Sequence, residues 1–298
     1  MANEDPKWPR ASHWLASSQP SPRFAVLGVP AHLTSISATN AHTTPAAVRE
    51  ALQRYSTYSS RIDGDLFDLP VVDLGDVSDP DWVAGESRVA LAIESCPQDA
   101  LLFAIGGDNS ITYSVMRGMG ELETAGLVTL DAHHDLRDGV SNGSPVRRLI
   151  DAGLDPRRIV QIGINDFSNS AAYGRYARSV GVTVVSRDEV ARRGIETVMR
   201  EALEIAGAAG GRIHVDLDVD VCDRSVVPAC PAAAPGGLSA HELRIAARCA
   251  GNDLRVRCVD ATEVDASQDS PDQRTVRLVA LCLLETAMGR LEALGLGD

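Results

Sequence analysis

The sequence lacks any apolar run that approaches the roughly 20 residues needed to span a bilayer. It is also short of positive charge, because 28 Lys and Arg stand against 41 Asp and Glu and leave a formal net charge of −13. This balance argues against a general basic surface for nucleic acid or for an anionic membrane. We therefore expect neither nucleic acid nor a membrane among its partners.

Cysteine is scarce, and its spacing lacks a metal-binding or redox pattern. The six cysteines include no CxxC pair and lie mostly inside apolar segments. This arrangement is typical of buried thiols in a reducing compartment, rather than of disulfides or a zinc knuckle. We therefore expect a cytoplasmic location.

The first 22 residues lack the basic stretch and apolar core of a secretory signal. We expect residues 1–22 to form a flexible N-terminal arm. The remaining chain, with an apolar content of 44% over the whole sequence, is long enough to bury one large core. Residues 23–298 are therefore predicted to form a single catalytic domain.

Eight short runs rich in β-formers alternate with stretches that suit helices. Most of the runs are apolar on both faces, as expected of strands that helices cover on two sides. The expected strands are 24–27, 70–74, 101–105, 127–130, 159–163, 182–185, 213–217 and 256–259. The expected helices are 44–55, 79–95, 111–123, 168–180, 188–206, 239–250 and 273–294. Strands and helices in this order predict an α/β fold with a parallel sheet.

Acidic residues gather where three of these strands end. Burying carboxylates beside apolar strands is costly unless a cation neutralises them. Ligands of open parallel sheets collect beyond the carboxyl ends of the strands, where these residues fall. The residues are Asp131, His133 and Asp135 after one strand, Asp218 and Asp220 after another, and Glu263 after a third.

The spacing of the acidic residues predicts a metal site. Alternate residues of an extended chain point the same way, so Asp131, His133 and Asp135 can converge while His134 points elsewhere. Oxygen ligands with one imidazole suit Mn²⁺ better than zinc. Two ions about 3.5 to 4 Å apart would balance the charge and activate a water. Any single Asp here has a simpler interpretation, as a solvated loop carboxylate.

Together with the paired glycines of the 105–111 segment, these clusters resemble the motifs of the arginase and agmatinase superfamily, the ureohydrolases. The motifs are Gly106-Gly107-Asp108-Asn109-Ser110, the 131–135 and 218–223 segments with Pro228 and 236–238, and Glu263-Val264-Asp265. The resemblance covers residues 24–290. It implies a three-layer α/β/α sandwich with an eight-stranded, mainly parallel sheet and a binuclear manganese centre. It also implies hydrolysis of a C–N bond at a guanidinium or amidine carbon, and a homo-oligomer such as a trimer or hexamer.

The resemblance also implies a role for each acidic residue. Asp131 and Asp218 correspond to carboxylates that bridge the two ions, and Asp135 to a ligand of the first ion that can also accept a proton. His133 and Asp220 correspond to ligands of the second ion. Glu263 corresponds to the acid that pairs with the cationic group of the substrate.

Asn109 departs from the superfamily pattern, which usually has a His ligand of the first ion at this position. An amide oxygen can coordinate manganese, but it is a weaker, neutral donor. We therefore expect Asn109 to be a weak ligand and the first site to be more loosely occupied.

The loop after the first aspartate cluster indicates the substrate. Arginases and agmatinases usually have a His-Gly motif there, whereas this chain has Asn142-Gly143-Ser144-Pro145. This loop and the preceding Arg137 resemble the formimidoylglutamases, which release glutamate and formamide from N-formimidoyl-L-glutamate in histidine degradation. A cationic Arg137 suits one of the two substrate carboxylates. Asn142 and Ser144 are further candidates for substrate contact.

Several alternatives stay open from the sequence. Arg137 can form a surface ion pair with Asp138, and Asn142 and Ser144 can simply shape the turn. His134 is a candidate proton donor, although alternation turns it away from the metals. The chain could instead hydrolyse a guanidino acid or an agmatine-like amine and release urea. It could also be a metal-poor protein that only binds a small cation.

Overall fold

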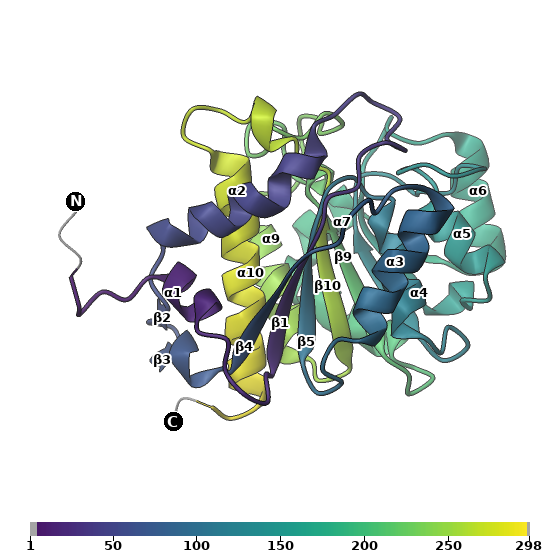
Figure 1. The fold of residues 1–298 in the computed structure, drawn as a ribbon. Coiled ribbons are helices and arrows are strands. Elements are labelled where there is room, and N and C mark those ends of the chain that lie inside the picture. Colours follow the sequence, from purple (N-terminus) through teal and green to yellow (C-terminus); the bar gives the residue numbers. More distant parts are fainter. Residues whose placement is uncertain (1–4, 297–298) are drawn as a thin grey trace.

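The computed structural model describes residues 5–296, and its centre is a sheet in which every strand pairing is parallel (Figure 1). The strands lie in the order β4-β1-β5-β10-β9-β6-β7-β8. They are β1 (Phe24–Val29), β4 (Val71–Asp76), β5 (Leu101–Gly106), β6 (Gly126–Leu130), β7 (Ile159–Ile164), β8 (Thr183–Ser186), β9 (Ile213–Asp218) and β10 (Val256–Thr262). All eight predicted strands are confirmed.

Two layers of helices cover the sheet. On one face, α10 (Arg274–Ala293) contacts α2 (Thr44–Ala51) and α9 (Ala240–Asn252), and α9 contacts α8 (Ile195–Ala206). On the other face, α4 (Ile111–Met119) contacts α3 (Trp82–Glu94) and α5 (Pro145–Asp151), while α6 (Ala171–Val180) packs beside β8. Residues of β1, β5 and β6 are buried throughout, which explains why these runs are almost entirely apolar. Strand β9 is also buried throughout, but its alternate residues His214, Asp216 and Asp218 are polar. The predicted three-layer α/β/α sandwich is confirmed.

The expectation of a flexible arm over residues 1–22 is wrong for part of that segment. Residues 11–16 form helix α1 (Ala11–Ala16), and the side chain of Trp14 is fully buried. Its indole Nε1 donates a hydrogen bond to the carbonyl of Leu69 at 3.0 Å, and its ring packs against Phe24. Burying one large aromatic ring holds this short helix on the domain. Residues 1–4 lie outside the described part of the chain.

The secondary structure differs from the prediction in several places. The single helix expected over 188–206 is two, α7 (Arg187–Arg193) and α8, because Gly194 between them has a φ of 79°. Gly120, at φ 70°, ends α4 before residue 123. Helix α5 and a small antiparallel pair, β2 (Tyr58–Ser59) and β3 (Gly64–Asp65), were not expected.

Two expectations from the sequence concern cysteines and membranes. All six cysteines are free thiols, and five of them are buried. Within residues 5–296, no helix is both long and apolar enough to cross a membrane.

Candidate metal and substrate site

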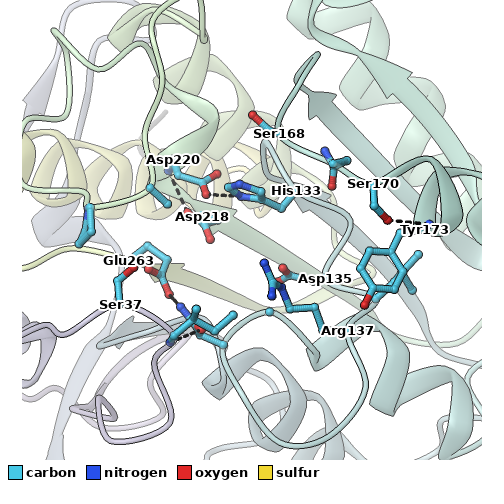
Figure 2. Close-up of a pocket in the computed structure, with 17 residues that line it drawn as sticks. Ser37, His133, Asp135, Arg137, Ser168, Ser170, Tyr173, Asp218, Asp220 and Glu263 are labelled. Atoms are coloured by element: carbon cyan, nitrogen blue, oxygen red, sulfur yellow. Dashed lines mark hydrogen bonds and ion pairs between the residues drawn. The ribbon is translucent and has the colours of Figure 1, made fainter.

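A cavity of about 400 Å³ opens at the carboxyl ends of the central strands (Figure 2). Asp135 and Arg137 reach it from the segment after β6, and Asp218 and Asp220 from the end of β9. Glu263, which follows β10 directly, lies across the cavity from Tyr173 in Figure 2. Strands far apart in the sequence thus bring their terminal residues into one pocket.

His133 and two aspartates form the tightest part of the acidic cluster. The imidazole Nδ1 lies 2.7 Å from Oδ2 of Asp220 and 3.5 Å from Oδ1 of Asp131. One possible ligand atom from each of the three residues lies within 4.8 Å of the other two. This agrees with the predicted convergence of Asp131 and His133.

Backbone amides help to fix the aspartates. Asp220 accepts from the N–H of Ala132 at 2.9 Å through Oδ1, which ties the end of β9 to the end of β6. Asp218 accepts from the N–H of Asp220 at 2.8 Å, and Asp131 from that of His133 at 2.6 Å. Each of these carboxylates therefore keeps a defined direction.

Burial and neighbouring charges shift the pKa values of the residues in this cluster. Burial raises the pKa of Asp131 to about 7 and holds the pKa values of Asp135 and Asp218 well above their ordinary range. Burial opposes charge on His133, but hydrogen bonds to Asp131 and Asp220 outweigh it and raise the imidazole pKa to about 11. Burial alone would raise the pKa of Asp220, but the bond from His133 lowers it.

The donor set fits a hard divalent cation. Four nearly buried carboxylates share a single imidazole, so the cluster is rich in oxygen donors and poor in positive charge. Carboxylates buried in this way are retained where they are paired or coordinate a metal. The residues that would hold the ions are Asp131, His133, Asp135, Asp218 and Asp220.

Asn109 does not present its oxygen to this cluster, contrary to the expectation that it is a ligand. Its Oδ1 accepts hydrogen bonds from the hydroxyls of Thr112 and Thr262, at 2.8 and 3.1 Å. Its Nδ2 donates to Oδ2 of Asp135 at 2.6 Å. Because two hydroxyls occupy the amide oxygen, the nitrogen faces the acidic residues, and an amide nitrogen is a donor rather than a metal ligand.

Glu263 is nearly buried at the edge of the cavity. Its Oε1 accepts from the backbone N–H of Asn109 and from Nδ2 of Asn142, both at 2.8 Å. Burial, followed by the charge of Asp108, raises the pKa of Glu263 to about 8, although both hydrogen bonds act in the opposite direction. The carboxylate is therefore a strong acceptor that a cationic ligand would stabilise in its charged form.

The paired glycines before Asn109 allow close packing of this strand end. A Cβ on Gly107 would come within 1.8 Å of the carbonyl oxygen of Ala31. The carbonyl of Gly107 also accepts from the N–H of Glu263 at 2.9 Å. Glycine at position 107 thus lets three chain segments meet beside the cavity.

Arg137 lines the cavity and is not part of a surface ion pair. Asp138, the partner considered from the sequence, instead lies 3.4 Å from Arg147. Among the described residues, no acid lies within 4.0 Å of the Arg137 guanidinium. Its charge therefore remains available to a ligand in the cavity.

Asn142 and Ser144 have different surroundings in the structure. Asn142 lines the cavity, whereas Ser144 is fully buried at the start of α5 and lies outside the cavity lining. The Ser144 hydroxyl donates to the carbonyl of Ser141 at 2.8 Å and accepts from its N–H at 3.0 Å. The turn alternative therefore holds for Ser144, and the expected substrate contact is wrong.

His134 points away from the acidic cluster, as alternation predicts. Its Nδ1 lies 2.7 Å from Oε1 of Gln161, and its side chain is buried outside the cavity lining. The environment offers no support for a role in moving protons at the site.

Several cavity residues were not identified from the sequence. Tyr173 and Ser170 come from the start of α6, where the Ser170 hydroxyl accepts from the N–H of Tyr173 at 3.2 Å and caps the helix. Ile36 and Ser37 come from the loop after β1. The only sequence signal for Ser170 was its place near the start of a predicted helix that follows a strand. This place indicates the carboxyl end of a strand, but it does not indicate a cavity.

Comparisons with known proteins agree with this geometry. The model of the arginase family matches residues 22–289. A formimidoylglutamase from Halalkalibacterium halodurans is 35% identical over 90% of this chain and 87% of that protein. One from Bacillus subtilis is 33% identical over 89% of this chain and 86% of that protein. The crystal structure of a B. subtilis formimidoylglutamase superposes with a TM-score of 0.90 at 30% identity, covering 97% of this chain and 94% of that one.

The chain therefore belongs to the arginase family. Its assignment as a metal-dependent hydrolase with an arginase-like fold, expected from the sequence, is confirmed.

Proposed function

We propose that this chain hydrolyses N-formimidoyl-L-glutamate to L-glutamate and formamide. The observation that carries the proposal is the charge arrangement of the cavity. Glu263 and the aspartates bring negative charge to it, and Arg137, which has no acidic partner within 4.0 Å among residues 5–296, brings positive charge. A formimidoyl group is a cation when protonated, and the glutamate part brings two carboxylates. The 35% identity to a formimidoylglutamase supports this substrate.

Each end of the substrate has a partner in the chain. Glu263 would accept N–H bonds from the formimidoyl cation, and Arg137 would bind one carboxylate with two parallel hydrogen bonds. Holding the ligand at both ends places its amidine carbon beside the aspartates. Agmatine has no carboxylate and would leave Arg137 unpaired.

The proposal includes two manganese ions per chain, held by Asp131, His133, Asp135, Asp218 and Asp220. When bound, such ions lower the pKa of a coordinated water toward about 7 and polarise the carbon that it attacks. A Trypanosoma cruzi formiminoglutamase of similar fold has been crystallised with Mn²⁺, and the oxygen-rich donor set supports the same ion here. Because two hydroxyls engage the Asn109 oxygen, the first site would have one ligand fewer, and we expect it to be more loosely occupied.

Asp135 is the group that we assign to proton transfer. It is buried, faces the cavity and accepts from Asn109 Nδ2 at 2.6 Å, which holds its carboxylate in place. A carboxylate held at the cavity wall beside the other ligands suits a group that accepts a proton and then gives it to the leaving nitrogen.

Three further expectations stay predictions. The six free cysteines support a cytoplasmic location, and a place in histidine degradation is expected from the substrate. A trimer or hexamer is expected from the family.

The proposal is tested by incubating manganese-loaded protein with N-formimidoyl-L-glutamate, agmatine, arginine and guanidinobutyrate. Formamide from the first compound alone is the expected result. Urea from any of the others would overturn the substrate assignment. Metal content is measured on the same sample, because no turnover together with less than one manganese per chain would favour the metal-poor binder.

A further inference from the structure

Asn142 uses both ends of its amide to join separate parts of the site. Its Oδ1 accepts from the N–H of Ile36 at 3.0 Å. Its Nδ2 donates to Oε1 of Glu263 at 2.8 Å and to the Ser35 hydroxyl at 3.3 Å. Its backbone N–H also donates to the carbonyl of Thr34, at 3.3 Å. One side chain thus links the 34–37 segment, the loop before α5 and the end of β10.

The bonds to Glu263 fall on one oxygen only. Oε1 receives both Asn142 Nδ2 and the backbone N–H of Asn109, whereas Oε2 has no donor among the described residues. Because Glu263 lines the cavity, two donors on one oxygen leave the other oxygen for a ligand. Figure 2 shows Glu263 held by such a bond at the edge of the cavity.

We propose that Asn142 is a positioning residue that holds Glu263 Oε1, so that Oε2 meets the cationic group of the substrate, and fixes the 34–37 segment as a wall of the cavity. The inference rests on the proposed hydrolase function and replaces the expected substrate contact of Asn142. It also explains why an amide suits this position, since both a donor and an acceptor are needed there.

Replacement of Asn142 by Asp separates the two tasks of the amide. Aspartate keeps the size of the side chain and an oxygen for the Ile36 N–H. It replaces the donor to Glu263 with a carboxylate oxygen, so two like charges would lie about 3 Å apart. If Asn142 only shapes the loop, N142D should behave like the unaltered chain, because it keeps the hydrogen bond from the Ile36 N–H.

The experiment compares N142D, N142A and S35A with the unaltered chain, on whichever of the four substrates above it turns over fastest. A hydrogen bond to a charged group is worth about 1.5–3 kcal/mol, so kcat/KM of N142A should fall by about tenfold to a hundredfold. N142D loses the same bond and adds a carboxylate beside Glu263, so it should lose more. S35A removes only the longer Nδ2 contact and should change kcat/KM by less than twofold.

A second background tests whether Glu263 carries the effect. In E263Q the glutamine amide can donate to an aspartate at 142, so N142D should cost much less there than in the unaltered chain. Equal losses in both backgrounds would mean that residue 142 contacts the substrate directly and would overturn the proposal.

Hydrogen exchange of the metal-free protein provides a readout without turnover. Exchange in the 106–111 peptide should be faster in N142D and N142A than in S35A, because the Asn109 N–H loses its fixed acceptor. Unchanged exchange and unchanged kcat/KM in N142D would refute the positioning role. Urea release by the unaltered chain would refute the proposed substrate and leave this comparison intact.

Discussion

At the level of single residues, the acidic site depends on the partner of each side chain as much as on its identity. His133 is the only basic group among the cluster aspartates, and Asp220 lies closest to it. Asp220 also accepts from the Ala132 N–H and so fixes the backbone that carries His133. Removing its charge should disturb both the donor set and its orientation.

We predict that Asp220→Asn lowers manganese affinity by at least about tenfold, as is typical when a ligand or its orienting partner is lost. Metal analysis after reconstitution and dialysis measures the change. Asp138→Asn is the matched control, because Asp138 is an exposed acid that pairs with Arg147. Equal manganese content in the two variants would contradict the assignment of Asp220 as a ligand.

Arg137 should affect substrate binding more than the chemical step. For Arg137→Met we expect KM for N-formimidoyl-L-glutamate to rise by about tenfold to a hundredfold, which corresponds to one charge-assisted interaction, with a smaller change in kcat. Steady-state kinetics measures both constants. Arg147→Met is the control, because that half-buried arginine lies outside the cavity lining and pairs with Asp138 and Asp151 instead. A similar rise in KM for both variants would point to net charge rather than to a specific contact.

Residue roles were predictable where they follow from the local backbone. The alternation in residues 131–135 placed Asp131 and His133 together and turned His134 away, and the structure agrees. The direction of the Asn109 amide was not predictable, because Thr262, which helps to fix it, comes from a strand more than 150 positions away. Contacts between distant elements override what a family pattern suggests for one position.

At the level of elements, helix α1 is the clearest addition to the predicted fold. The first 22 residues show no extended apolar pattern, so nothing in their order indicates that Trp14 is buried. One ring against Phe24 and one bond to Leu69 anchor the helix.

We predict that Trp14→Ala lowers the free energy of unfolding by about 3–5 kcal/mol, because it leaves a large cavity and an unpaired carbonyl. Chemical denaturation monitored by circular dichroism measures the loss. Trp8→Ala is the control, since the Trp8 side chain is 56% exposed, and its effect should stay within about 0.5 kcal/mol. Equal small effects would show that α1 contributes little to stability.

Strands were easier to predict than helix ends for a physical reason. Strands covered on both faces are apolar at nearly every position, and β1, β5 and β6 stand out for that reason. The break at Gly194 lies within a pattern that suits one continuous helix. A single glycine is a weak signal, because glycine is also tolerated inside helices.

At the level of the whole molecule, strand order creates the site. The four adjacent strands β5, β10, β9 and β6 end beside Asn109, Glu263, Asp218 and Asp131 respectively. Sequence order separates these residues by up to 154 positions, as the Asn109–Glu263 bond shows. The rule that ligands collect beyond the carboxyl ends of parallel strands placed the acidic residues at one edge of the sheet. Hydrophobic patterns do not predict the order of the strands, so which of these residues are neighbours did not follow from the patterns.

The same convergence should make stability depend on pH when metal is absent. Burial raises the pKa of Asp131 from 3.8 to about 7 and that of Glu263 from 4.5 to about 8. In the unfolded chain both groups ionise near their ordinary values, so between about pH 4 and 8 the folded metal-free protein binds more protons than the unfolded one. Stability is then fully present below the unfolded pKa values and falls as the pH rises through the folded ones. His133, with its pKa raised to about 11, acts in the same direction above about pH 6.5.

We therefore predict that the urea midpoint of protein treated with EDTA falls steadily from pH 5 to pH 8, and that saturating manganese removes most of this fall. Bound ions neutralise the carboxylates, so the folded state no longer needs their protons. Asp131→Asn in EDTA should show a shallower fall, because one group with a raised pKa is gone. If metal-free protein were more stable at pH 8 than at pH 5, burial could not be raising the pKa values of these acids, and the prediction would be wrong. If manganese raised the urea midpoint by the same amount at pH 5 and at pH 8, metal binding would not be coupled to the protonation of these acids.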